Sequence, residues 1–379
     1  MSKKSSTKKT TNPKQYFSWF NHLSVTYKVA AALMSCFLVI VLFTYIGGQY
    51  YINKHKNEPL KLGVTFVPDY ARYFGLDPEG TMDAMIDDLG IRQFRLVSYW
   101  KNIEANRGTY DFSELDWQFK KAEESGSKVS LAIGLRQPRW PECHEPSWAK
   151  GRPIEEWRAD LYRYIEATVN RYKDNPALES YQLENEYFMS VFGECTDFSR
   201  DRLVAEADLV KRLDSNHKLI ISRSNNWGGV PMRSPTPDQF AVSIYKRVWD
   251  KTATKRYFEY PYPAWFYSSL AGYGEIVSGK SMVIHELQTE AWLPEGYKMN
   301  QAKDIPEMYK SLDAERLDDR IQYGLDTGIR EIYLWGPEWW YWLKQNGHPD
   351  LWNTAKDKIG QAKAADETSL SSKIDQKTY

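Results

Sequence analysis

The chain has 379 residues, which suits one large α/β barrel of about 250 residues with appended segments. Its 50 basic and 50 acidic residues give a formal net charge of zero, which argues against a general nucleic-acid-binding protein. Aromatic residues make up 15% of the chain, with 15 Trp and 26 Tyr, more than a core requires. This excess favours aromatic surfaces of the kind that stack on sugar rings, although a Trp-rich core would account for many of these residues.

The amino-terminal region predicts a membrane segment. Residues 1–28 form a basic tail rich in Ser, Thr and Lys, without an acidic residue, and we expect this tail to be disordered. Residues 29–50 predict a transmembrane signal-anchor helix, because the stretch 29–48 is uncharged. At 1.5 Å per residue that stretch is about 30 Å long, enough to cross the hydrocarbon core of a bilayer.

The charges around this segment predict its orientation. Lysines before the span outnumber Lys54 and Lys56 after it, so we expect a cytoplasmic amino terminus and an extracytoplasmic domain at the cell membrane. No small-residue cleavage site follows the span, which argues against a signal peptide. The stretch ending in Cys36 resembles a lipoprotein cleavage box, but Cys36 lies in the middle of the apolar run, which disfavours this alternative. Residues 51–59 are interpreted as a linker.

Residues 60–355 alternate strand and helix patterns. The first helix is expected from Asp77 to Gly90, and the others at 110–126, 155–174, 199–214 and 314–328. Eight strands are predicted, at 61–68, 91–100, 128–134, 178–188, 218–224, 240–246, 281–286 and 330–336. Eight strands with intervening helices predict an α/β fold, a (β/α)8 TIM barrel preceded by one transmembrane helix. Residues 356–379 are interpreted as a polar tail, helical at first and then disordered.

Two glutamates fall at the carboxyl ends of predicted strands, where the catalytic groups of such barrels lie. Asn185 and Glu186 end the fourth strand, and Glu286 ends the seventh. An amide beside a carboxylate suits acid–base chemistry on a sugar, because the amide can hold a ring hydroxyl while the acid protonates the leaving oxygen. Glu184 and Glu290 are the nearest competing carboxylates.

These residues resemble the hallmarks of the clan A glycoside hydrolases, which include cellulases, β-mannanases and β-galactosidases. The Asn185–Glu186 pair, Glu286, Arg95 on the second strand and Trp335 on the eighth match the pattern of this clan over roughly residues 60–350. The seventh strand reads His-Glu-Leu-Gln, whereas many cellulases read Thr-Glu-Phe-Gly. The motif of this chain resembles the β-galactosidase-like branch more closely. The third strand lacks a histidine that is common in cellulases. The resemblance therefore indicates the clan and leaves the family and the substrate open.

The resemblance implies a retaining hydrolase of β-linked glycosides or polysaccharides, with Glu186 as acid/base and Glu286 as nucleophile. Asn185 would bind the hydroxyl next to the anomeric carbon, and Arg95 and Tyr245 would hold Glu286 ionised. The remaining candidate substrate-binding residues are Trp335, Trp100 and Trp292. A non-catalytic carbohydrate-binding barrel and a transglycosylase that uses the same residues stay open as alternatives.

Other features are less specific. Cys143 and Cys195 follow neighbouring strands and could form a disulfide outside the cytoplasm. The histidines are scattered without metal-ligand spacing, so we expect no metal site, and no cofactor is predicted. Trp339, Trp340 and Trp342 could form a sugar platform or pack beneath a loop.

Overall fold

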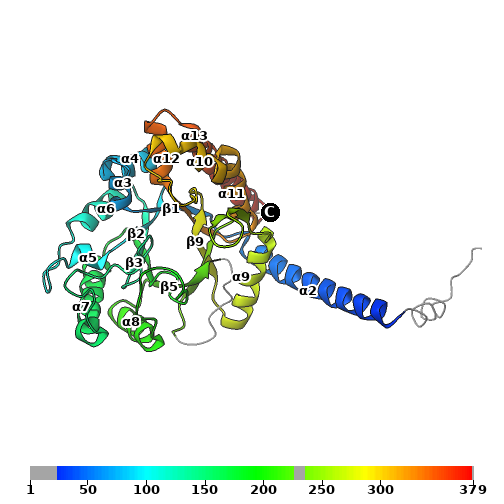
Figure 1. The fold of residues 1–379 in the computed structure, drawn as a ribbon, viewed down its shortest axis with the longest axis horizontal. Coiled ribbons are helices and arrows are strands. Elements are labelled where there is room, and N and C mark those ends of the chain that lie inside the picture. The colour runs from blue at the N-terminus through cyan, green and yellow to red at the C-terminus, as the bar shows by residue number, and fades with distance from the viewer. Residues whose placement is uncertain (1–23, 226–234, 378–379) are drawn as a thin grey trace, which may run out of the picture.

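Eight parallel strands close into a barrel in the computed structural model, which describes residues 24–225 and 235–377 (Figure 1). Around the barrel the strand order is β1-β10-β9-β6-β5-β4-β3-β2. The bounds are β1 Lys61–Phe66, β2 Gln93–Val97, β3 Lys128–Ile133, β4 Leu178–Leu183, β5 Lys218–Asn225, β6 Gln239–Ile244, β9 Met282–Gln288 and β10 Glu331–Trp335. The predicted TIM-barrel class is confirmed.

Helices surround the barrel because the outward-facing side chains of the strands are apolar; in β9, for example, Met282, Ile284 and Leu287 belong to the buried apolar cluster that also contains helix residues. The bounds are α3 Pro68–Tyr73, α4 Pro78–Asp87, α5 Trp100–Ile103, α6 Ser113–Glu124, α7 Ile154–Tyr172, α8 Arg200–Leu213, α9 Ala264–Ser278, α10 Ile305–Ser311, α11 Ala314–Asp326, α12 Pro337–Gln345 and α13 Asp350–Lys377, with a 3₁₀ turn at Ala302–Asp304. The carboxylates of Asp77 and Asp313 cap α4 and α11 by accepting hydrogen bonds from backbone N–H groups of their first turns.

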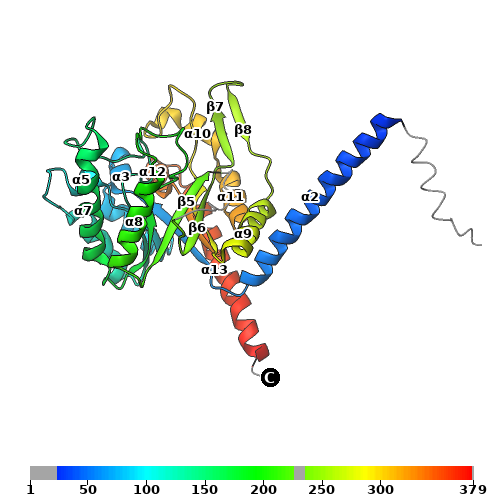
Figure 2. The same cartoon turned by 90° about the horizontal axis from the view of Figure 1, so that it is seen from below.

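An antiparallel hairpin, β7 (Arg247–Asp250) with β8 (Arg256–Glu259), was not predicted from the sequence. It extends the connection that follows β6, and it projects from the end of the barrel where the strands have their carboxyl ends (Figure 2). Its strands are only four residues long and mostly half-buried or exposed, so they lack the apolar run that marks a barrel strand. The aromatic stretch that follows forms α9.

Helix α13 continues as a regular helix through most of the segment interpreted as a polar tail. Leu351, Trp352, Ala355 and Ile359 are fully buried at helical spacing, so one face of its first turns packs on the barrel domain. Most other positions hold polar residues, many of them Lys, Asp or Glu, which is why the sequence reads as polar.

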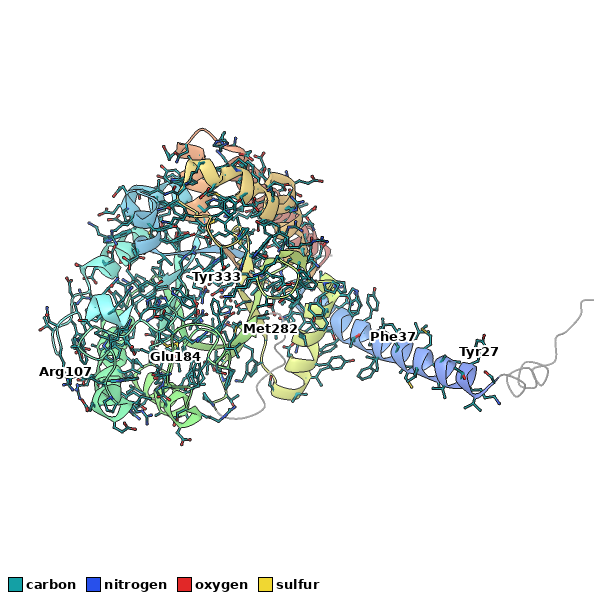
Figure 3. The ribbon with its side chains drawn as sticks, viewed as in Figure 1. Tyr27, Phe37, Arg107, Glu184, Met282 and Tyr333 are labelled. Atoms are coloured by element: carbon teal, nitrogen blue, oxygen red, sulfur yellow. A yellow bond between two sulfur atoms is a disulfide. The ribbon has the colours of Figure 1, made fainter. Side chains whose placement is uncertain are left out.

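The long helix α2 (Val25–His55) extends away from the barrel and includes the predicted span, with Tyr27 and Phe37 on its projecting part (Figure 3). By its length and composition alone, this helix is long and apolar enough to cross a membrane. Its last turns, within and just beyond that span, pack against α9, where Gly47 and Gly48 let the two backbones approach closely. Tyr51 and His55 are buried in the same contact, so α2 continues into the segment interpreted as a linker.

Candidate active site

A cavity of about 380 Å³ opens at the carboxyl ends of the barrel strands. Its lining combines carboxylates with aromatic rings, which is the chemistry of a sugar-binding site. The lining carboxylates are Asp69, Glu142, Glu186, Glu286 and Glu290, and the lining aromatic residues are Tyr70, Tyr73, Tyr99, Trp140, Phe192, Tyr245, Trp292 and Trp335. Both glutamates singled out from the sequence therefore face one cavity.

Glu286, on β9, is held by two donors. The Arg95 guanidinium donates to its Oε1 at 2.9 Å, and the Tyr245 hydroxyl donates to its Oε2 at 2.7 Å. Arg95 is completely buried inside the barrel, where a charge requires a partner. Both carboxylate oxygens thus have a donor, and one of the two donors is a cation, so the carboxylate is held in a fixed orientation at the cavity.

Asn185, predicted to bind substrate, is buried and is not among the residues that line the cavity. Its side-chain oxygen accepts hydrogen bonds from Arg95 at 2.8 Å and from Gln182 at 3.1 Å. Its amide nitrogen donates to Glu142 Oε2 at 3.2 Å. One arginine thus links the amide that precedes Glu186 to the carboxylate of Glu286, and it fixes the two strand ends relative to each other.

Glu186 follows β4 in a strained conformation, with φ of 44°, in the left-handed region that non-glycine residues rarely adopt. Its backbone N–H donates to Ser222 Oγ at 2.8 Å, which helps hold this turn. Its side-chain atom Oε1 is buried without a hydrogen-bond partner among the described residues. An unpaired buried polar atom lowers the stability of the fold, so the unpaired Oε1 indicates that Glu186 has a role beyond packing.

Burial and, second to it, the nearby charge of Glu286 together raise the pKa of Glu186 to about 7. The two carboxyl groups therefore differ in their surroundings: Glu286 is paired with Arg95, whereas Glu186 is desolvated and keeps its proton up to neutral pH. Two carboxyl groups in such different surroundings can serve as an acid and a nucleophile at the same pH.

The tryptophans predicted to bind substrate separate into two groups. Trp335 and Trp292 line the cavity; Trp335 stacks under the Arg139 guanidinium, and Trp292 packs edge-on against Tyr245. Trp100 instead is buried between α5 and α7 and donates its indole N–H to Glu104 at 2.6 Å. Its position after β2 is at the correct end of the barrel, but its ring points into the packing, so we withdraw Trp100 as a substrate-binding residue.

The loop between β3 and α7 supplies cavity residues that the sequence analysis did not single out. Arg139, Trp140, Glu142 and His144 all line the cavity from this loop. Burial raises the pKa of Glu142 well above its ordinary value, with the charge of Glu186 as the next cause. The signal was available, because a long loop at the carboxyl end of a barrel strand is where such residues are expected.

A disulfide joins Cys143 in this loop to Cys195 in the loop after β4. It links the segment that carries Glu142 to the segment that follows Glu186, and so fastens two walls of the cavity together. A cross-link between two loops removes conformational freedom that each would otherwise have.

The two competing glutamates have other partners. Glu290 lines the cavity and pairs with Arg139 at 2.9 Å, and the Tyr70 hydroxyl donates to it as well. Glu184 is fully buried behind β4, paired with Arg202 at 2.8 Å and accepting hydrogen bonds from the backbone of the β3 loop. Glu184 is therefore a structural ion-pair partner, whereas Glu290 belongs to the cavity.

The Trp residues after β10 pack beneath the loops. Trp339 and Trp340 are fully buried, and the Trp340 indole donates to the Thr289 carbonyl oxygen at 2.6 Å. Within the described ranges, no cluster of three or more His, Cys, Asp or Glu side chains is arranged to hold a metal ion. His144 stacks on Tyr99, and burial lowers its pKa to about 3, so this imidazole is neutral in the cavity wall.

No protein-family model matches the chain. In sequence it is similar to Beta-galactosidase BgaH of Haloferax lucentense, at 25% identity over 146 residues that cover 34% of this chain and 22% of that protein. Beta-galactosidase Bga of Halorubrum lacusprofundi is similar over the same share of this chain, also at 25% identity, and over 20% of its own length. The matched stretch thus spans about a fifth of the length of these curated relatives.

Solved structures share the fold. GH5_18 from Bifidobacterium longum subsp. longum has a TM-score of 0.54 at 12% identity, over 80% of this chain and 79% of that chain. GH5_18 from Streptomyces cattleya has a TM-score of 0.53 at 14% identity, over 73% of this chain and 70% of that chain. At such low identity the likeness shows the barrel architecture, and the chemistry has to be argued from the residues.

Proposed function

We propose that this chain, whose resemblance to the clan A glycoside hydrolases is supported by sequence and fold, is a membrane-anchored retaining hydrolase of β-linked glycosides or polysaccharides. The observation that carries the proposal is the pair Glu186 and Glu286: two carboxyl groups in one cavity, one desolvated and the other held by Arg95 and Tyr245.

In the first step, a carboxylate oxygen of Glu286 attacks the anomeric carbon and forms a covalent glycosyl–enzyme ester. The bond from that carbon to the glycosidic oxygen breaks, and Glu186 gives its proton to the leaving oxygen. In the second step, Glu186 takes a proton from water while the water oxygen attacks the same carbon. The ester bond breaks, and the sugar leaves with its original configuration, since two inversions restore it.

The neighbouring groups support this assignment of roles. Arg95 and Tyr245 stabilise Glu286 as the anion that attacks and later leaves. The high pKa of Glu186 gives it a proton to donate near neutral pH. Trp335 and Trp292 offer ring faces for the apolar side of a bound sugar. Asn185 would keep the end of β4 in place through Arg95.

Anchoring is supported by how α2 is built into the domain. A cleaved signal peptide leaves the mature protein, but the last turns of α2 are packed on α9, with Tyr51 and His55 buried. His55 also pairs with Glu275 of α9 at 2.8 Å. Removing α2 would expose this surface, which favours a retained anchor. The lysines before the span favour a cytoplasmic amino terminus and an extracytoplasmic barrel.

The direct test uses the full chain in detergent on a panel of aryl β-glycosides, with Glu186→Gln and Glu286→Gln beside the unaltered protein. We expect Glu186→Gln to lower kcat by about 10²–10⁴-fold, because proton transfer is lost. Glu286→Gln should abolish turnover, because no covalent ester can form. Glu290→Gln is the matched control, since this carboxylate also lines the cavity but has no part in the proposed steps.

A barrel that binds sugar without turnover would support the non-catalytic alternative instead. Equal losses from Glu186→Gln and Glu290→Gln would contradict the assignment of the acid. Products with an acceptor sugar in place of water would indicate a transglycosylase, which shares the first step.

A further inference from the structure

Exposed apolar side chains gather at the end of the barrel that carries the cavity. Outside α2, the structure describes seven large hydrophobic residues as exposed. Five follow the carboxyl ends of strands: Tyr73, Trp140, Val191, Phe258 and Tyr297. Val191, Phe258 and Tyr297 do not line the cavity, so binding of a sugar there does not explain their exposure. The other two, Ile276 and Val277, lie at the end of α9, the helix that packs on α2.

The β7–β8 hairpin at this end of the barrel is basic. Residues 246–260 contain five Lys or Arg and two acidic residues, a net charge of +3. Both acidic residues are already engaged: Glu259 pairs with Arg247 at 3.5 Å, and Asp250 accepts hydrogen bonds from the turn at Thr252 and Thr254. Lys251, Lys255 and Arg256 are exposed, and no ion pair to them is found among the residues that the structure describes.

Aromatic rings accompany these cations. Trp249 packs edge-on against Tyr257 across the hairpin, and Phe258 lies edge-on against Tyr260. Phe258 is 47% exposed, a large fraction for a phenyl ring. Trp249, Tyr257 and Tyr260 are half-buried. Accessible aromatic rings mixed with Lys and Arg are typical of surfaces that rest in the headgroup layer of a bilayer.

Helix α2 inclines toward the same end of the molecule. In Figure 2 the helix rises from the amino-terminal end of the barrel toward the level of the β7–β8 hairpin, whereas α13 leaves at the opposite end. The helix is fixed in this direction by α9, through the close approach of Gly47 to Gly272 and the stacking of Phe43 on Tyr273. The apolar part of α2 therefore lies on the side of the barrel to which the cavity opens.

We propose that the β7–β8 hairpin, residues 246–260, docks on the surface of the bilayer that α2 crosses, with its cations on anionic lipid headgroups. This inference rests on the proposed membrane span. The hairpin begins directly after Tyr245, and the backbone N–H groups of Lys246 and Arg247 donate to Gln288 on β9, two residues beyond Glu286. A docked hairpin thus holds the cavity at the membrane surface, and the substrate class becomes a glycan carried on or lying against the bilayer.

The test places one environment-sensitive fluorophore on the full chain, reconstituted in vesicles. Ala253→Cys at the exposed hairpin turn is labelled with a nitrobenzoxadiazole in a Cys36→Ser background, because Cys36 is the free cysteine among the described residues. Asp174→Cys is the matched control, exposed before β4 at the opposite end of the barrel. In vesicles with phosphatidylglycerol we expect a blue-shifted emission at position 253 and quenching by headgroup-labelled lipids, and neither at position 174.

Charge reversal gives the second arm. Lys251→Glu with Lys255→Glu should return the emission at position 253 toward its value in detergent, as should phosphatidylcholine vesicles or about 0.5 M salt, because screening weakens surface charges. An aqueous signal at position 253 in anionic vesicles would overturn the proposal, as would equal quenching at both positions. Flotation of the chain with the vesicles tests the span separately, and the fluorescence needs no turnover, so failure of the proposed catalysis would be distinguishable.

Discussion

Glu186 and Glu286 are the same kind of side chain in two different surroundings, and this difference is the basis of the proposed chemistry. Arg95 and Tyr245 donate to Glu286, so its charge is compensated within the barrel. Glu186 is buried, and its Oε1 has no hydrogen-bond partner in the described part of the chain. Burial outweighs the nearby charges of Arg136 and Arg95, so Glu186 favours its neutral form, which is the form that a general acid needs.

The raised pKa of Glu186 also predicts how stability depends on pH. The folded state holds the proton up to about pH 7, whereas the ordinary value is 4.5, so unfolding becomes easier as pH rises through this window. A pKa shift from 4.5 to about 7 lowers the free energy of unfolding by roughly 3 kcal/mol at most. This loss of stability is complete above pH 7. Glu186→Gln does not titrate, so at pH 8 this variant should melt several degrees higher than the unaltered chain.

The advantage of Glu186→Gln should shrink as pH falls toward 4.5, because the glutamate then becomes protonated in the unfolded state as well. Thermal melts in detergent at pH 4.5, 6 and 8, all at one scan rate, measure it. A constant difference in melting temperature across this range would contradict the pKa assignment and would indicate a packing effect instead.

Individual side-chain directions were the least predictable part of the site. Arg95, Tyr245 and Trp335 could be placed at one rim because each falls at the carboxyl end of a predicted strand. Trp100 meets the same criterion, yet its ring turns away because α7 offers Trp157 and Tyr164 to pack against. Position along a strand predicts the rim, but the direction of a side chain after the strand depends on distant packing partners.

At the scale of elements, alternation of apolar strands and amphipathic helices was enough to predict the barrel. The β7–β8 hairpin was missed, and the extent of the helix in the polar tail was underestimated, because both depend on tertiary contacts. The hairpin is held at its base by Gln288, and α13 by burial of Trp352 and its neighbours. The position of the β3 loop at the rim could be predicted, but not which of its side chains face the cavity, because a loop has no period that separates inward from outward positions.

The contact between α2 and α9 depends on glycine. A methyl group added at Gly272 would overlap the carbonyl oxygen of Gly47. Gly272→Ala should therefore destabilise the domain by roughly 1–3 kcal/mol, partly offset by the better helix propensity of alanine. Thermal unfolding in detergent measures this effect as a lower melting temperature.

Gly360→Ala is the matched control, because Gly360 lies within α13 and has no heavy atom within 4 Å of an added Cβ. It should leave the melting temperature unchanged or raise it slightly. If both substitutions act alike, the close packing of α2 on α9 is not a determinant of stability.

At the scale of the whole molecule, α2 joins a predicted membrane span to an enzyme-like barrel through one continuous helix. The sequence indicated both parts, but it gave no sign that the last turns of the helix would be buried against α9. That contact matters because it fixes the direction in which α2 leaves the barrel, and the proposed docking of the β7–β8 hairpin depends on this direction.

A retained α2 predicts that the mature protein stays in the membrane at full length. After extraction with alkaline carbonate, the chain should remain in the membrane pellet, and mass analysis should find residues 29–50 still attached. A mature chain that begins after this segment and appears in the soluble fraction would show that the segment is a cleaved signal peptide.

The proposed mechanism depends most on Glu286 as the nucleophile, and covalent trapping tests this role most directly. The full chain is incubated with 2-deoxy-2-fluoro β-glycosides that carry a good leaving group, which slow the second step so that the ester accumulates. We predict that the mass of the protein rises by one fluorosugar and that peptide mapping places this sugar on Glu286, with none on Glu286→Gln. A sugar attached to Glu290 or Glu142, or turnover of these glycosides by Glu286→Gln, would contradict the account.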